Sequence, residues 1–445
     1  MEGDFMKLAL ASMLLASVTV ASAANIAVID SGLDYKHEQI VPHLWTNAFE
    51  TEDRRDEDNN GYQDDVHGWN FAEQTSQIID YKYLGTFSPD CKKFFDIQGK
   101  VFLGKASDSD KEWIKVKQSD AKFIAELGKF GNFVHGTHVA SIAARDSKNK
   151  VMGIKLIPTE VKPFIEAASK LKIADRWDVL GMAFSALAKQ QISMLAEIAR
   201  FVAFHKMDVA NGSFGTGFKQ AKMITDASFR IVFFRKPTEE ESKKAAGLFI
   251  STLVSEGKAF VDAAPDTLFV FAAGNDGMSN DDYGTSPANI KADNVITVGA
   301  TYKNEFFAPF SNYGTKMVDI AAPGMLIHSA IPGNDYLEVS GTSQASPYVA
   351  NVAAQIKEAN PKLKPIEIKN ILVGTVDKKG FLSEKVTSSG IVNTERAVVA
   401  AQLSTSMSIA EALTRAKTQV EDVVTNKEAV IPSSALPLPL FPLFR

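Results

Sequence analysis

Three short motifs, far apart along this 445-residue chain, constrain its fold more than any other feature. They are IAVIDSG at 26–32, HGTHVA at 135–140 and GTSQASP at 341–347. In this order they supply a carboxylate, an imidazole and a hydroxyl, the groups that an activated serine nucleophile requires. Such a nucleophile works only where the three groups meet, so the fold must bring the three motifs together.

Strand and helix signals alternate along the chain. Short apolar runs are typical of strands buried on both faces of a parallel sheet, and longer amphipathic segments between them are typical of helices. The predicted strands are 25–30, 207–210, 268–273, 294–300 and 318–321. The predicted helices are 134–145, 190–205, 238–263, 342–359 and 409–424. This alternation predicts an α/β fold of three layers, with a mostly parallel central sheet and helices on both of its faces.

The composition excludes several classes of protein. With 45% hydrophobic and 23% charged residues, the chain resembles ordinary globular proteins. Its net charge of −5 is spread along the sequence, which argues against a nucleic-acid partner or an anionic membrane surface. The single cysteine, Cys91, allows no intramolecular disulfide.

The N-terminus is typical of an export signal. An apolar run at 8–21 is followed by the small residues ASA at 21–23, the pattern that signal peptidase accepts. The run is too short for a comfortable membrane span. We therefore expect residues 1–23 to direct the chain to a secreted or periplasmic location, with no stable membrane span.

The three motifs resemble those of the subtilisin-like serine proteases, in which the acid, the histidine and the serine occur in this order. The resemblance runs from about residue 25 to about residue 401. It implies that Ser343 is the nucleophile, that His135 is its general base and then a general acid, and that Asp30 orients the imidazole. It also implies a structural role for His138. Taken alone, a serine at a helix start is often only a cap, but the three motifs together favour catalysis.

The same resemblance divides the chain into parts. Residues 1–23 are expected to be the signal peptide, 24–402 a subtilisin-like peptidase domain, and 403–445 a C-terminal helix with a proline-rich tail. Segments at about 74–130 and 158–188 match no family motif and are predicted insertions. Cleavage after residue 23 would leave no room for the propeptide that most secreted members carry, so we expect folding and latency to be managed differently.

Further segments are implied to contact substrate. Asn275, within FAAGNDG at 271–277, matches the asparagine that binds the oxyanion of the tetrahedral intermediate together with a backbone N–H group. The alternative is an asparagine in a turn, because Gly-Asn-Asp-Gly is also a turn sequence. Two more segments resemble the walls of the pocket before the scissile bond: Ser213, Phe214 and Gly215 on one side, and Ala272, Ala273 and Gly274 on the other.

An acidic loop at 56–65, DEDNNGYQDD, predicts a calcium site. Oxygen ligands alternate and glycine stands sixth, as in an EF-hand loop, but His67 replaces the bidentate glutamate at the twelfth position. The resemblance adds that related loops before a GWNF segment bind calcium. The expected ligands are Asp56, Asp58, Asn60, the Tyr62 carbonyl, and Asp64 or Asp65. A solvated acidic loop without a metal is the alternative.

Together these features predict a secreted, monomeric serine endopeptidase that hydrolyses protein or peptide substrates through an acyl-enzyme intermediate. The alternative is a catalytically silent relative that binds peptides. The acidic serine-carboxyl relatives use glutamate in place of histidine, so the full histidine motif argues against them. Gln344 follows the nucleophile where many relatives have methionine, which predicts activity that tolerates mild peroxide.

Overall fold

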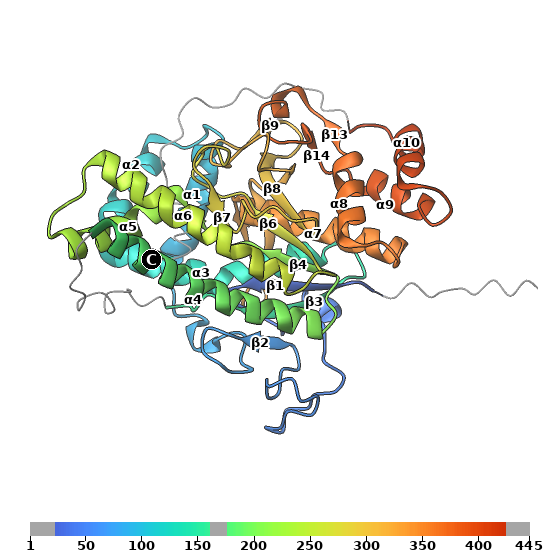
Figure 1. Ribbon diagram of the computed structural model, residues 1–445, viewed down its shortest axis with the longest axis horizontal. Coiled ribbons are helices and arrows are strands. Elements are labelled where there is room, and N and C mark those ends of the chain that lie inside the picture. The colour runs from blue at the N-terminus through green and yellow to red at the C-terminus, as the bar shows by residue number, and fades with distance from the viewer. Residues whose placement is uncertain (1–22, 161–175, 424–445) are drawn as a thin grey trace, which may run out of the picture.

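The computed structural model describes residues 23–160 and 176–423, and their centre is a ten-stranded, mostly parallel sheet (Figure 1). The parallel strands follow the order β10 (Ile320–Pro323), β8 (Val295–Tyr302), β6 (Leu268–Ala272), β4 (Val209–Gly212), β1 (Asn25–Asp30), β3 (Lys150–Lys155) and β2 (Gly68–Asn70). The short strands β9 (Phe306–Phe307), β13 (Asp377–Lys378) and β14 (Gly390–Ile391) extend it. The predicted α/β fold with a mostly parallel sheet is therefore confirmed.

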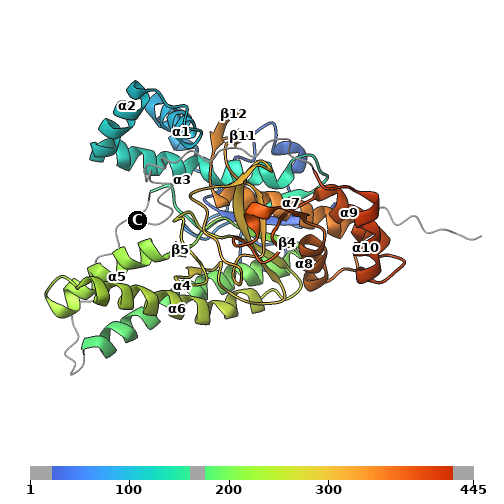
Figure 2. The same ribbon diagram turned by 90° about the horizontal axis from the view of Figure 1, so that it is seen from above.

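Alternate side chains of β1 face two different helical layers. Ile26 and Val28 belong to one apolar core, and Ala27 and Ile29 belong to another on the opposite face of the sheet. The first core lies under α3 (Ala121–Ala144) and α7 (Thr342–Ala359), and the second under α4 (Arg176–Phe204) and α6 (Glu239–Asp262), as Figure 2 shows. Because strand side chains alternate between faces, a strand between two helical layers must be apolar throughout.

The helix that carries the HGTHVA motif begins earlier than the sequence predicts. We expected it to begin at residue 134, but α3 starts at Ala121, so the predicted start is wrong and His135 lies well inside the helix. The side chain of Asp120 caps the helix by accepting the backbone N–H groups of Lys122 and Phe123. The apolar spacing of the motif helix continues back into the segment assigned to the insertion, and this explains the longer helix.

The predicted insertion at 74–130 folds into a helical layer beside this extension. It contains η2 (Tyr81–Tyr83), α1 (Pro89–Phe102), α2 (Asp108–Ser119) and the first turns of α3, which pack with the hairpin of β11 (Ile327–Ile331) and β12 (Asp335–Val339). Cys91 is fully buried in the apolar cluster between them. Burial raises the pKa of its thiol to about 12, so the thiol stays protonated and unreactive at neutral pH.

More helices add to the layer of α4 and α6, and the last helices of the described chain pack at the C-terminal side of the sheet. The N-terminal half of α4 and α5 (Phe218–Phe233) pack on α6, which opens with a capping box of Thr238 and Glu241. The remaining elements are η1 (Val41–His43), β5 (Thr216–Gly217), β7 (Thr285–Ser286), α8 (Pro365–Gly374), η3 (Gly380–Leu382), α9 (Thr394–Leu403) and α10 (Ile409–Gln419).

The C-terminal helix predicted at 409–424 is α10, which begins at Ile409 but ends at Gln419, and it packs on α9. Its Ala412 and Ala416 are fully buried. Arg396 of α9 is 2% exposed and holds the end of this segment by donating to the carbonyl of Val420 and the carboxylate of Asp422. The expected signal peptide up to residue 22, residues 161–175 of the predicted 158–188 insertion, and the proline-rich tail from residue 424 lie outside the described residues. Within 23–160 and 176–423, no helix is long and apolar enough to cross a membrane.

Candidate active site

The side chains of Asp30 and His135 meet at the carboxyl edge of the sheet. Strand β1 ends at Asp30, whose Oδ1 accepts hydrogen bonds from His135 Nδ1 at 2.6 Å and from the backbone N–H of Ser31 at 2.7 Å. The two side chains are 0% and 1% exposed, so water competes little for this bond. Because the carboxylate holds Nδ1, the ring presents Nε2 on its opposite side.

The next two residues of the histidine motif fasten α3 to the turn after β1. A Cβ at position 136 would overlap the carbonyl oxygen of Gly32, so only glycine allows this approach of helix and turn. The side chain of Thr137 accepts the backbone N–H of Asp34 at 2.9 Å. These two contacts therefore help to set the distance between His135 and the end of β1.

His138 has a different environment from His135. It is fully buried, and its Nε2 lies 3.1 Å from the carbonyl oxygens of both Ile327 and Leu337 in the β11–β12 hairpin. Burial lowers the pKa of His138 to about 3, so the ring is neutral at physiological pH. These contacts join α3 to the hairpin.

Ser343 reaches the same edge of the sheet from the first turn of α7. Ser213 follows β4, and the parallel register of β1 and β4 puts it level with Asp30. The hydroxyl of Ser343 donates to the Ser213 carbonyl at 3.3 Å, and the hydroxyl of Ser213 donates to the Ser343 carbonyl at 2.9 Å. This reciprocal pair places the serine hydroxyl one strand away from the acid.

Asn275, just beyond β6, is held with its amide nitrogen available as a donor. Its Oδ1 accepts the backbone N–H of Thr342 at 2.8 Å and the Thr342 hydroxyl at 2.9 Å. Asn275 Nδ2 and the backbone nitrogen of Ser343 each lie 3.6 Å from the position that a Cβ on Gly341 would occupy. Two N–H donors therefore converge beside the serine, which is the arrangement that an oxyanion needs.

The two predicted walls follow neighbouring strands, 213–215 after β4 and 272–274 at the end of β6. Phe214 is 6% exposed and its ring lies 6.5 Å from that of Phe271, so it packs into the core beneath the wall. The carbonyl of Ala273 accepts the side-chain amides of Asn280 and Asn312. Polar side chains behind the wall thus stabilise the backbone of this segment.

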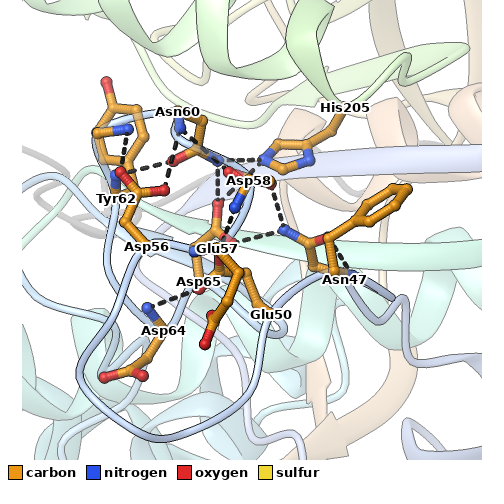
Figure 3. Close-up of polar contacts among 12 residues, drawn as sticks. Asn47, Glu50, Asp56, Glu57, Asp58, Asn60, Tyr62, Asp64, Asp65 and His205 are labelled. Carbon is orange, nitrogen blue, oxygen red and sulfur yellow. Dashed lines mark hydrogen bonds and ion pairs between the residues drawn. The ribbon is translucent and has the colours of Figure 1, made fainter.

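The acidic loop spans 47–65 without helix or strand and carries two groups of close donor atoms (Figure 3). Carboxylate oxygens of Glu50, Asp56 and Asp58 all lie within 4.8 Å of one another. The second group consists of Asp58, Asp65 and the imidazole of His205, whose donor atoms also lie within 4.8 Å of one another. His205 Nε2 is 3.0 Å from Asp65 Oδ2.

Glu50 organises the backbone of this loop. Its Oε1 accepts the N–H groups of Glu57 and Asp58 at 2.8 and 3.2 Å, and its Oε2 accepts that of Asp64 at 3.0 Å. Burial raises the pKa of Glu50, and the negative charges of Asp65 and Glu57 add to this rise, although the N–H bonds oppose it. Concentrated negative charge of this kind favours a cation.

The expected ligands are only partly brought together. Asp56, Asp58 and Asp65 belong to the two groups, and the Asn60 amide donates to Asp65 at 2.8 Å. Asp64 does not belong to them, because its Oδ1 caps the backbone N–H groups of residues 53 and 54.

The Tyr62 side chain points away from the loop and donates to Glu197 of α4 at 3.0 Å. Sequence reasoning missed Glu50, which precedes the motif, and His205, which lies 140 positions from Asp65. No local pattern in the loop points to either residue.

Comparison with known proteins agrees with this geometry. Residues 21–395 match the model of the subtilase family of peptidases. The chain is 32% identical to subtilisin BL of Lederbergia lenta over 265 residues, which is 59% of this chain and 77% of that protein. It is 40% identical to alkaline elastase YaB of Bacillus sp. over 134 residues, 30% of this chain and only 33% of the relative.

A third relative, subtilisin-like protease 1 of Plasmodium vivax, is 25% identical over 85% of this chain and 47% of its own length. A solved cold-adapted subtilisin-like serine proteinase shares 20% identity over 83% of this chain and 89% of its own, with a TM-score of 0.45. The chain therefore belongs to the subtilase family, a class of serine endopeptidases.

Proposed function

We propose that this chain is an active serine endopeptidase in which Asp30, His135 and Ser343 form the catalytic triad. The observation that carries the proposal is the buried 2.6 Å bond between His135 Nδ1 and Asp30, at the sheet edge where Ser343 also lies. A buried carboxylate that holds one ring nitrogen fixes the imidazole so that the other can take a proton.

In the proposed reaction the Ser343 hydroxyl turns from the Ser213 carbonyl and attacks the carbonyl carbon of the scissile peptide. His135 takes the hydroxyl proton during the attack and returns it to the leaving amine, which departs as the acyl-enzyme forms. A water molecule then attacks the acyl-enzyme while His135 takes its proton. His135 returns this proton to the Ser343 oxygen as the carboxylic acid product is released. Asp30 stabilises the transient imidazolium.

Asn275 Nδ2 and the Ser343 backbone N–H would bind the oxyanion in both steps. Asn275 is held before substrate arrives, because the backbone N–H and the hydroxyl of Thr342 donate to its amide oxygen, and the Ser343 N–H belongs to the first turn of α7. Donors oriented in advance need no reorganisation as charge develops, which is why they favour the transition state. The walls at 213–215 and 272–274 would flank the residue before the cleaved bond.

Covalent labelling by a fluorophosphonate tests the proposal directly. We expect one equivalent of label, lost in Ser343→Ala and retained in Ser346→Ala, a second buried serine in the same helix. Peptide cleavage should disappear with the label. A folded wild-type chain that takes no label would instead support the silent peptide-binding alternative.

We also propose that the acidic loop binds calcium as a structural ion. The all-oxygen group of Glu50, Asp56 and Asp58 fits this hard cation, whereas the imidazole of His205 suits it poorly and would serve to position Asp65. A bound divalent ion would offset the repulsion among these carboxylates and brace a loop that has no regular structure.

The apolar segment at the N-terminus supports export to a secreted or periplasmic location. We expect the exported chain to act on protein substrates as a monomer. N-terminal sequencing of the exported protein should find Ala24 as the first residue.

A further inference from the structure

Lys155, the last residue of β3, is a buried cation that the reaction described above does not use. Its side chain is 1% exposed and forms an ion pair in which its Nζ lies 2.6 Å from Oε2 of Glu73. Removing a charge from water is costly, and apolar side chains often fill such a position with no loss of stability. A lysine buried at the end of a central strand therefore requires an explanation.

Lys155 lies beside the acid of the proposed triad. It is the register partner of Asp30 in the neighbouring strand β1, so their Cα atoms are about 4.8 Å apart and their side chains lie on the same face of the sheet. On this face Asp30 reaches His135 of α3. The Cδ atom of Lys155 lies 3.4 Å from the position that a Cβ on Gly32 would occupy, so the side chain runs along the turn that follows Asp30. The ammonium group and the imidazole therefore belong to one buried region.

The two charges of the ion pair have different surroundings. Glu73 follows β2, is 45% exposed, and also accepts the side-chain amide of Asn70. Burial raises the pKa of Glu73, but the hydrogen bonds from Lys155 and Asn70 outweigh it, so the pKa is lowered and the carboxylate is negative at neutral pH. Water screens the exposed carboxylate more than the buried ammonium. The proposed triad therefore experiences mainly the positive end of the pair.

We propose that Lys155 is a positioning residue whose charge sets the pH at which His135 becomes an effective base, an inference that rests on the proposed protease function. A nearby positive charge disfavours the imidazolium, so the neutral imidazole persists to lower pH. Glu73 fixes the ammonium in place and partly offsets its charge. Other titratable side chains on the surrounding elements include Asp30, Asp34, Tyr35, Asp80, Tyr81, His138, Arg145, His328 and Asp335. They are the same in every variant described below.

The pH dependence of kcat/KM for one peptide substrate tests the proposal. In Lys155→Met the midpoint of the acidic limb should rise by roughly 0.5 to 1 pH unit, because the imidazolium loses a repulsive neighbour. The value of kcat/KM at pH 9 should stay within about twofold of the wild type, because His135 is neutral there in both proteins. In Glu73→Gln, whose amide oxygen can still accept Lys155, the midpoint should fall by a smaller amount. Lys155→Arg keeps the charge and should keep the wild-type midpoint.

Lys258→Met is the control, since it removes the lysine of an exposed ion pair with Asp262 on α6 and should leave the midpoint unchanged. Losses of kcat/KM that are equal at every pH would mean that Lys155 only supports the fold, and would overturn the proposal. So would a midpoint in Lys155→Arg that matches Lys155→Met. Glu73→Gln keeps the test valid even if Lys155→Met fails to fold, because its shift has the opposite sign. Absence of fluorophosphonate labelling in the wild type would instead overturn the protease function itself.

Discussion

The sheet edge and the acidic loop use similar polar side chains but position them in different ways. Asp30, His135 and Ser343 stand on a strand or a helix, so the geometry of the regular elements brings them together. The carboxylates at 47–65 are held instead by individual bonds to backbone N–H groups of the same loop. Motifs on regular elements thus predict which side chains meet, whereas a loop motif predicts only the chemistry present.

The largest expected effect is the fall in kcat when Asn275, the proposed oxyanion donor at the sheet edge, is replaced. Asn275→Asp keeps an acceptor for the backbone N–H of Thr342 but removes the amide donor, so kcat should fall roughly 100- to 1000-fold while the melting temperature changes little. Asn275→Ala removes both functions and should also melt lower. Steady-state kinetics and calorimetry measure the two variants. If Asn275→Asp retained more than a tenth of kcat, the amide would not bind the oxyanion.

Calcium tests whether the loop works as one site. In a Ser343→Ala background, which prevents self-digestion, a calcium concentration 100 times the Kd should stabilise the fold by about 2.7 kcal/mol. Asp58→Asn alters the carboxylate shared by both donor groups and should abolish the calcium-dependent rise in melting temperature.

Asp64→Asn is the matched control, since it removes one negative charge from the same loop. Its amide oxygen can still accept the backbone N–H groups of residues 53 and 54, so it should change the melting temperature little and retain the full calcium response. A loss of that response in Asp64→Asn but not in Asp58→Asn would reverse the assignment of ligands.

The sequence predicts the sheet edge well and the surroundings less well, for physical reasons. The bounds of α7 agree with the prediction at both ends, because Gly341 precedes it and Pro361 follows it. The start of α3 was predicted wrongly because apolar spacing continues without a break into the insertion. Likewise, His205 meets Asp65 only through the packing of α4 beside the loop, which no local pattern encodes.

His138 is expected to have a smaller effect, which is seen in how the free energy of unfolding depends on pH. Its pKa is about 3 in the folded state and about 6.5 in an unfolded chain, so below about pH 6.5 the unfolded state alone binds a proton. The stability that this difference represents is complete above about pH 6.5 and is lost as pH falls towards 3. In denaturant unfolding, this group should lower the free energy of unfolding by up to about 1.4 kcal/mol for each unit that the pH falls between about 6.5 and 3.

His138→Gln should be less stable at pH 7, because it disturbs the bonds to the hairpin carbonyls, but should lose less stability between pH 7 and pH 5 than its parent. Both chains carry the same carboxylates, so the difference between their slopes isolates the histidine. Equal slopes would mean that His138 does not titrate differently in the two states.

The smallest expected effect is the change in peptide-cleaving activity when the protein is exposed to mild peroxide. Gln344 cannot form a sulfoxide, and the buried thiol of Cys91 has a raised pKa, so mild peroxide should leave peptide cleavage almost unchanged. Gln344→Met places an oxidisable sulfur beside the nucleophile, and its activity should decay as mass spectrometry finds sulfoxide at position 344. If the wild type lost activity equally fast through oxidation near Ser343, the edge would contain a sensitive group that its geometry does not reveal.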